Sequence, residues 1–428
     1  MIGVTDMTNI TNMADNNIPV ALPYILEFEQ LGLGMFVHFG LYSMLKQGEW
    51  ALDLLSLDEN EYRSLTDSFN PSSMSDMVLV AKRAGCKYIC LTTRHHDGFS
   101  LYDTKGLSYY DAPHCLAGRD LVSEFVCECR KAEIVPFFYH TTLDWSRNDF
   151  EDDFDSYLEY LKASVRILCT EYGKIGGIWF DGNWSKPDAD WKEDELYSMI
   201  RNLQPEAMIV NNTGLYARGT VGNEYIDSLT YERGLPTPID RRGMKKYLAG
   251  EMCQTLNNHW GDADDIDFKS VRQLIEEICR CRRIGANMLL NVGPDKDGKI
   301  PLMARATMDS IGRWMDSFGE AIYNGRPYIS EPDKDDFVLK DVNDENVFYL
   351  FKHGLGCGGD VNVVMNGAEV GQTVINGFSL PVESVEWMDN GEELTFEAKG
   401  SALTVNCTSY KYGTNLTVRV AKIRTKNI

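Results

Sequence analysis

Short apolar runs alternate with amphipathic stretches from about residue 31 to residue 325. The runs are too continuous for half-exposed strands, so they predict strands that are buried on both faces. They occupy residues 33–39, 86–92, 134–139, 176–180, 207–210 and 286–292. The stretches between them repeat apolar residues at helical spacing, at residues 73–84, 121–132, 153–172, 193–202, 268–284 and 301–318. So many strand–helix units predict a closed, TIM-like (β/α) barrel with some irregularity.

A different pattern begins after about residue 328. Short alternating runs are separated there by Gly, Asn and Asp turns, which is typical of a small antiparallel β-sandwich. The sequence therefore predicts an α/β protein with two domains, a catalytic barrel over residues 1–328 and a C-terminal β-sandwich over residues 329–428. We expect the sandwich to pack beside the barrel rather than to bind carbohydrate, because it has no distinctive aromatic platform.

The composition of the chain argues against some classes of binding partner. The net charge is −22 and the pI is about 4.8, which argues against a nucleic acid or an anionic membrane surface. No apolar run reaches the roughly 20 residues that span a bilayer. The first 20 residues have neither a basic nor an apolar segment, so we expect a cytoplasmic protein. The eleven cysteines form no CxxC pair and are expected to be reduced thiols.

Several apolar runs end in residues that can carry chemistry. The first ends at His38, the second runs into His95 and His96, and the third ends in Tyr139-His140. Asp181 follows the fourth, and Asn211-Asn212 follow the fifth. Because the active site of a (β/α) barrel lies at the C-terminal ends of its strands, these side chains are predicted to share one pocket.

Two kinds of site fit this set. A metal-dependent hydrolase would use His38, His95 or His96, His140 and Asp181 as ligands. However, adjacent histidines on a strand are expected to point to opposite sides. A sugar site would use the histidines for hydroxyl groups and nearby aromatic rings for the apolar ring face. The aromatic candidates Trp50, Tyr139, Trp179, Trp184 and Trp260 favour the sugar site, for which we expect neither a metal nor another cofactor.

At these positions the sequence resembles glycoside hydrolase family 29, the α-L-fucosidases. Six blocks occur in the order expected for that family, and together they cover roughly residues 30–325. They are Gly34–Ser43 with Gly48-Glu49-Trp50, Thr92–Phe99, Tyr139–Trp145, Ile178–Gly182, Glu251–Thr255 with Trp260-Gly261, and Asn287–Pro294 with Asp297-Gly298.

The resemblance implies an exo-acting enzyme that releases terminal α-L-fucose from fucosylated glycans with retention of configuration. Retention needs two carboxyl groups about 5–5.5 Å apart. Asp181 falls on the family's nucleophile position. Glu232, in Asp227-Ser-Leu-Thr-Tyr-Glu232, is the favoured acid/base, and Glu251 is the alternative.

The same comparison implies a set of fucose-binding residues. They are His38, Glu49, Trp50, His95, His96, Tyr139 and Trp179, and His140 could equally be structural. The chain departs from the family pattern in one place, because no Arg follows the fifth strand; Arg218 is the nearest substitute. The sequence defines neither the fucosyl linkage, the aglycone nor the oligomeric state, although a homo-oligomer is compatible with it. A fucose-binding protein without activity is a further alternative, which the retained carboxylates disfavour.

Overall fold

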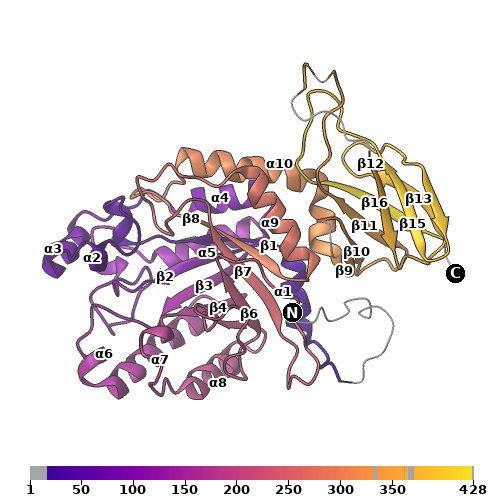
Figure 1. Cartoon of the computed structure of the whole chain (residues 1–428). Coiled ribbons are helices and arrows are strands. Elements are labelled where there is room, and N and C mark those ends of the chain that lie inside the picture. Colours follow the sequence, from indigo (N-terminus) through magenta and orange to yellow (C-terminus); the bar gives the residue numbers. More distant parts are fainter. Residues whose placement is uncertain (1–16, 331–334, 361, 365–370, 427–428) are drawn as a thin grey trace. The chain divides into compact units, whose positions relative to one another are not determined.

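The computed structural model describes residues 17–330, 335–360, 362–364 and 371–426 (Figure 1). Within these residues, eight parallel strands pair in sequence order, and the last pairs with the first to close a barrel. The predicted (β/α) barrel is thereby confirmed. Its strands are β1 Leu33–Val37, β2 Tyr88–Arg94, β3 Val135–Thr141, β4 Gly177–Asp181, β5 Met208–Asn211, β6 Ser228–Glu232, β7 Ala249–Thr255 and β8 Asn287–Val292.

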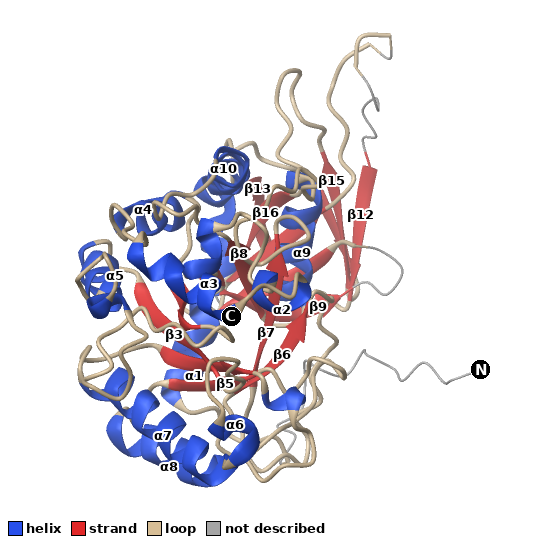
Figure 2. Cartoon of the chain, turned by 90° about the vertical axis from the view of Figure 1, so that its left-hand side faces the viewer, coloured by secondary structure: helices blue, strands red, loops and turns tan. Residues whose placement is uncertain are grey.

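Helices follow most of these strands and cover the outside of the sheet, as α4, α5, α7 and α8 do in Figure 2. Helix α5 begins directly after Asp120, because the Asp120 side chain accepts a hydrogen bond from the Ser123 backbone N–H at 2.8 Å. The longer helices are α1 Pro23–Leu31, α4 Ser75–Arg83, α5 Leu121–Lys131, α7 Phe154–Thr170, α8 Glu193–Leu203, α9 Val271–Arg283 and α10 Leu302–Asn324. Shorter ones are α2 Ala51–Leu54, α3 Glu59–Arg63, α6 Asp149–Asp152, η1 Leu41–Met44, η2 Ser64–Asp67, η3 Ala112–His114 and η4 Asn183–Ser185.

Strands β6 and β7 were not predicted from the sequence because their buried positions include polar residues. Thr230, Glu251 and Thr255 are almost fully buried, yet they break the apolar run by which a buried strand is recognised. The connections on either side of β6, residues 212–227 and 233–248, contain no helix. The barrel is therefore irregular on the side where Glu232 lies.

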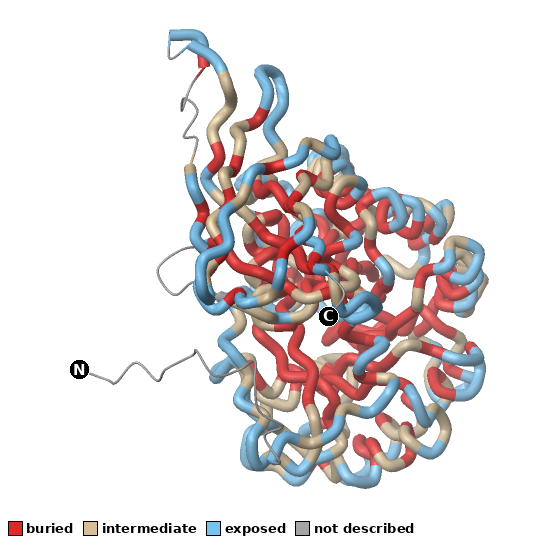
Figure 3. Tube along the Cα trace, turned by 90° about the vertical axis from the view of Figure 1, so that its right-hand side faces the viewer, coloured by how far each residue is buried: buried red, intermediate tan, exposed pale blue. Residues whose placement is uncertain are grey.

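The barrel interior is filled mainly by aromatic and other apolar side chains, including Phe36, Tyr88, Phe137, Trp179 and Leu289. Tyr88 and Phe137 pack against each other in this layer, with ring centroids 5.1 Å apart. All residues of β2, β7 and β8 are buried, and Figure 3 shows buried segments running through the interior with exposed residues around the outside. A solid core of this kind places the reactive side chains at the ends of the strands.

The C-terminal residues form two antiparallel sheets, which confirms the predicted β-sandwich. Their core contains Phe348, Leu350, Trp387, Leu403 and Ile423. One sheet has the order β13-β16-β11-β10-β9 and the other β12-β15-β14. The bounds are β9 Gly325–Ser330, β10 Phe337–Asp341, β11 Val347–Lys352, β12 Gly371–Asn376, β13 Val382–Trp387, β14 Phe396–Lys399, β15 Ala402–Cys407 and β16 Arg419–Thr425.

Contacts divide the described chain into two compact units. Residues 19–269 and 286–312 form one, and residues 270–285 group with the chain from residue 313 onwards in the other. The domain boundary predicted between residues 328 and 329 stays a prediction. No described helix is both long enough and apolar enough to cross a membrane. Most of the N-terminal segment on which the predicted location rests lies outside the described residues.

Candidate active site

A cavity of about 280 Å³ opens where the barrel strands end. The structure brings together in it the strand-end residues His38, His95, His96, Tyr139 and Asp181. Its full lining is Phe36, His38, Trp50, His95, His96, Tyr139, Trp179, Asp181, Trp184, Asn212, Leu215, Tyr216, Glu232, Cys253 and Trp260. Phe36, Leu215, Tyr216 and Cys253 were not predicted as site residues from the sequence.

Asp181 is the last residue of β4, and hydrogen-bond donors surround its carboxylate. Oδ1 accepts from Trp184 Nε1 at 2.8 Å and from Asn212 Nδ2 at 3.2 Å. Oδ2 accepts from the Tyr139 hydroxyl at 3.2 Å, and His96 Nε2 lies 3.6 Å from the same oxygen. The carboxylate is thus held from several sides, while 16% of the side chain stays exposed.

Glu232 is the last residue of β6 and faces the same cavity. Its Oε2 accepts a hydrogen bond from Asn212 Nδ2 at 2.7 Å. Burial, followed by the negative charge of Asp181, raises the pKa of Glu232 to about 7. A carboxyl group in this state can give up a proton near neutral pH and take it back.

Glu251 lies deeper in the barrel and does not line the cavity. Its Oε1 accepts from the Tyr88 hydroxyl at 2.5 Å, and its Oε2 accepts from Trp179 Nε1 at 2.9 Å. The side chain is 2% exposed, and burial raises its pKa to about 7. Glu251 therefore supports the indole of Trp179 from below, with both of its oxygens engaged.

Three neutral histidines lie in the cavity wall. His38 Nδ1 pairs with Asn291 Oδ1 at 2.6 Å, and burial lowers the pKa of His38 to about 3. Burial also lowers the pKa of His96, and that of His95 well below its ordinary value. Neutral imidazoles can donate to or accept from hydroxyl groups, which is the role that the resemblance implies for them.

The expectation that His95 and His96 point to opposite sides is wrong. Both rings line the cavity, and their centroids lie 4.2 Å apart. The pairing of β2 with β3 shifts register between Thr92 and Arg94, so the regular alternation of the strand ends just before the two histidines. Even so, the described residues contain no group of three or more His, Cys, Asp or Glu side chains placed to hold a metal ion.

His140 does not line the cavity. Its Nε2 lies 2.9 Å from Ser164 Oγ on α7, and its Nδ1 lies 2.7 Å from the Thr141 carbonyl oxygen. Of the two roles that the sequence left open for His140, these contacts favour the structural one.

Glu49 and Arg218, two predicted substrate-binding residues, do not line the cavity either. Glu49 Oε2 accepts from the backbone N–H groups of Trp260 and Gly261, at 3.0 and 2.8 Å, and so holds the loop that carries Trp260. Arg218 donates through Nε to the backbone carbonyl of Glu232 at 2.7 Å. Glu49 is buried behind the loop that carries Trp260, whereas Arg218 is an exposed residue beside the end of β6.

Aromatic rings form much of the cavity wall. Trp50 and Trp184 stack with centroids 6.0 Å apart, and Trp179 stacks with Tyr139 at the same separation. The ring of Trp260 lies 5.1 Å from that of His38. Such surfaces fit the apolar face of a sugar ring.

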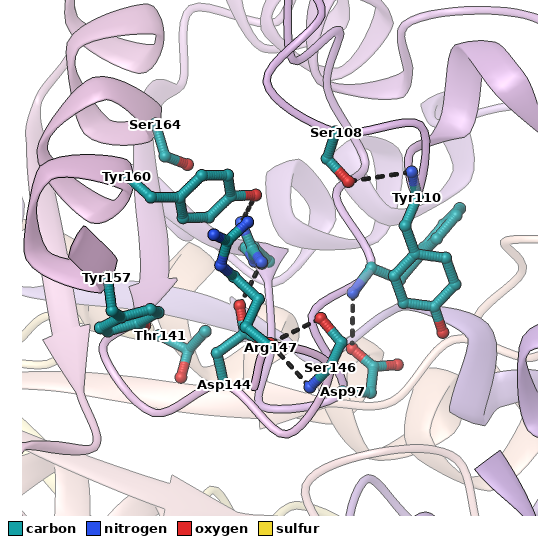
Figure 4. A network of polar contacts seen from close by, with 12 residues as sticks. Asp97, Ser108, Tyr110, Thr141, Asp144, Ser146, Arg147, Tyr157, Tyr160 and Ser164 are labelled. Atoms are coloured by element: carbon teal, nitrogen blue, oxygen red, sulfur yellow. Dashed lines mark hydrogen bonds and ion pairs between the residues drawn. The ribbon is translucent and has the colours of Figure 1, made fainter. Parts of the chain in front are cut away.

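A buried polar network links the end of β2 to the loop after β3, which carries Asp144 and Ser146 (Figure 4). The guanidinium of Arg94 contacts both the Asp144 carboxylate and the Tyr160 hydroxyl, and Asp144 Oδ1 also accepts from Ser146 N at 2.9 Å. Gly98 is required beside it, because its φ is +76° and an added Cβ would lie 2.1 Å from Ser146 Oγ. The network holds the His95-His96 segment against the loop after β3.

Comparison with known proteins identifies the family. A model of the alpha-L-fucosidase family matches residues 16–320. The chain belongs to the alpha-L-fucosidase family. The resemblance seen in the sequence is confirmed, and with it the assignment to the glycoside hydrolases.

Individual alpha-L-fucosidases are also similar to this chain. Tissue alpha-L-fucosidase of Bos taurus is 28% identical over 345 residues, which cover 72% of this chain and 70% of the bovine one. The structure of alpha-L-fucosidase isoenzyme 1 from Paenibacillus thiaminolyticus has a TM-score of 0.78 and 28% identity, with 95% of this chain and 99% of that chain covered. A structure from Bacteroides thetaiotaomicron, a family 29 covalent intermediate trapped with 2-fluoro-fucosyl fluoride, shares the fold at a TM-score of 0.79 and 23% identity, covering 99% of this chain and 100% of that one.

Proposed function

We propose that the protein is a retaining exo-α-L-fucosidase that releases terminal α-L-fucose from fucosylated glycans, with Asp181 as nucleophile and Glu232 as acid/base. The proposal rests on the pairing of these two carboxyl groups through Asn212. Because one nitrogen bonds to both, the two bonded oxygens lie within about 6 Å of each other, which fits a retaining pair rather than the wider inverting pair.

In the first step, an Asp181 oxygen attacks the anomeric carbon while the bond to the leaving oxygen breaks. Glu232 transfers its proton to that oxygen. In the second step, Glu232 takes a proton from water, the water oxygen bonds to the anomeric carbon, and the ester bond to Asp181 breaks. The covalent intermediate trapped in the Bacteroides thetaiotaomicron relative is consistent with this double displacement.

The cavity walls have the chemistry that a fucosyl group needs. His38, His95 and His96 would bond to the ring hydroxyls, and Phe36 and Trp179 would cover the apolar face and the methyl group. The proposed substrate is a neutral sugar, so it suits a site whose histidines are uncharged. The cytoplasmic location remains a prediction.

Hydrolysis of 4-nitrophenyl α-L-fucoside and of a panel of fucosylated oligosaccharides tests the activity, and NMR should show α-fucose as the first product. We expect Asp181→Gly to abolish turnover. Glu232→Ala should lose about 10²- to 10⁴-fold on an oligosaccharide, and azide should restore its activity on the activated fucoside. Rescue of Glu251→Ala instead of Glu232→Ala would move the acid/base role to Glu251. First release of β-fucose would refute retention.

A further inference from the structure

The side-chain amide of Asn212 joins the two carboxyl groups of the site. Nδ2 lies 3.2 Å from Asp181 Oδ1 and 2.7 Å from Glu232 Oε2. An amide NH₂ group carries two hydrogens, so one can serve each carboxyl group. Among the described residues, no other side chain is hydrogen-bonded to both Asp181 and Glu232.

The orientation of this amide is set by its surroundings. The Thr230 hydroxyl on β6 lies 3.4 Å from Asn212 Oδ1, where it can donate to the amide oxygen. The Asn212 backbone N–H donates to the Phe180 carbonyl on β4 at 2.9 Å, and the residue is only 3% exposed. Turning the amide over would place its oxygen against two carboxyl groups, so the donors remain directed at Asp181 and Glu232.

We propose that Asn212 is a positioning residue that holds the nucleophile and the acid/base at their working separation and stabilises whichever of the two is ionised. This role rests on the function proposed above. Before the first step the negative charge is on Asp181; in the ester intermediate it is on Glu232. A neutral donor bonded to both can strengthen its bond to each in turn, because a hydrogen bond to an ionised acceptor is the stronger one. Asn212 itself exchanges no proton.

A guanidinium group in this place would act differently. Its permanent charge would favour the ionised form of Glu232 and so oppose its work as an acid. At this point the chain reads Val210-Asn-Asn-Thr-Gly214 and has no Arg. The amide therefore supplies the donors without a charge.

Other groups also act on the two carboxyl groups, and they stay in place when Asn212 is changed. Asp181 faces His96, Tyr139 and Trp184. Glu232 is influenced by the charges of Asp181, Arg233 and Glu49, and the Cys253 thiol lies close to it. Any shift in the pH profile of kcat/KM in an Asn212 variant can therefore be assigned to loss of the amide, since these other groups are the same in wild type and variant.

The test is the pH profile of kcat/KM for 4-nitrophenyl α-L-fucoside. We expect Asn212→Ala to lower kcat/KM by about 10- to 100-fold at the wild-type optimum. Both limbs of the profile should move to higher pH, because each carboxylate loses a donor that favours its ionised form. Asn212→Asp should move both limbs further, since it adds a third acid to the site.

The neighbouring Asn211 provides a matched control. Its amide is also buried, but it donates to the Tyr197 hydroxyl at 2.7 Å and to Glu193 Oε1 at 3.4 Å, and it bonds to neither Asp181 nor Glu232. Asn211→Ala should leave both limbs where they are in the wild type. If Asn212→Ala does not fold, Thr230→Val replaces it, because loss of that hydroxyl frees the amide and should shift the limbs in the same direction. Unmoved limbs in the folded variant would overturn the proposal, whereas an inactive wild type would instead overturn the proposed function.

Discussion

The variant Glu251→Gln tests whether Glu251 supports the fold or acts in catalysis, because the two roles predict different effects of pH on the free energy of unfolding. The folded protein keeps a proton on Glu251 up to a pKa of about 7, because burial disfavours the charge, whereas the ordinary value is 4.5. Between these two values the folded state holds a proton that the unfolded chain has released. Stability from this group is therefore fully present below about pH 4.5 and is lost as the pH rises through about 7.

The size of the effect follows from that interval. A separation of roughly 2.5 pH units, at about 1.4 kcal/mol for each, corresponds to about 3 kcal/mol. At pH 5 we expect Glu251→Gln to be about as stable as the wild type, because its amide oxygen can accept from Trp179 and its NH₂ can donate to the Tyr88 oxygen, as the protonated carboxyl group can. By pH 8 the variant should be the more stable protein by up to about 3 kcal/mol, since it has no charge to bury.

Guanidinium unfolding at pH 5, 6, 7 and 8, followed by tryptophan fluorescence at constant ionic strength, measures this difference. The exposed Glu61→Gln serves as the control, and its stability relative to the wild type should not change with pH. A difference between Glu251→Gln and the wild type that stays constant over this range would refute the reasoning. Turnover reduced by about a hundredfold or more in Glu251→Gln, with loss of the high-pH limb, would identify Glu251 as the acid/base.

Four further outcomes are expected. Arg94→Met should destabilise the fold by about 3–5 kcal/mol in thermal unfolding, because it leaves Asp144 buried without its cation. Adding Asp144→Asn should recover part of this loss. If the stability losses of the two single variants simply add in the double variant, the two residues are not energetically paired. Trp184→Phe removes a donor to Asp181 and should move the low-pH limb of kcat/KM upwards; an unchanged limb would show that the indole N–H is dispensable. Dialysis against EDTA should leave turnover intact, whereas a loss restored by zinc would point to a metal site after all. Tyr216 lines the cavity yet is 81% exposed, so its ring lies where the part of a glycan beyond the fucose would pass. Tyr216→Ala should therefore lower kcat/KM for a fucosylated oligosaccharide more than kcat/KM for fucosyl fluoride. Tyr109 is 79% exposed and does not line the cavity, so the same change in Tyr109→Ala would show the effect to be nonspecific.

The sequence alone predicted the barrel, because six of its strands are apolar runs that only a doubly covered parallel sheet can bury. It also predicted that His38, Tyr139 and Asp181 meet, since parallel strands bring their C-terminal ends to one face. Both inferences depend on local patterns. Strands β6 and β7 were not predicted, because Thr230, Glu251 and Thr255 are polar and become buried only through their neighbours in the closed sheet.

Tertiary structure decided what local patterns leave open. Glu232 and Glu251 are the same residue type in similar segments, but only one of them faces the cavity, while the other is enclosed by Tyr88 and Trp179. The contact of Asn212 with both carboxyl groups likewise depends on how three consecutive strands, β4, β5 and β6, pair in the closed sheet. A strand's residues determine which side chains it can bury, but the distance between two side chains on different strands is set by how the barrel closes.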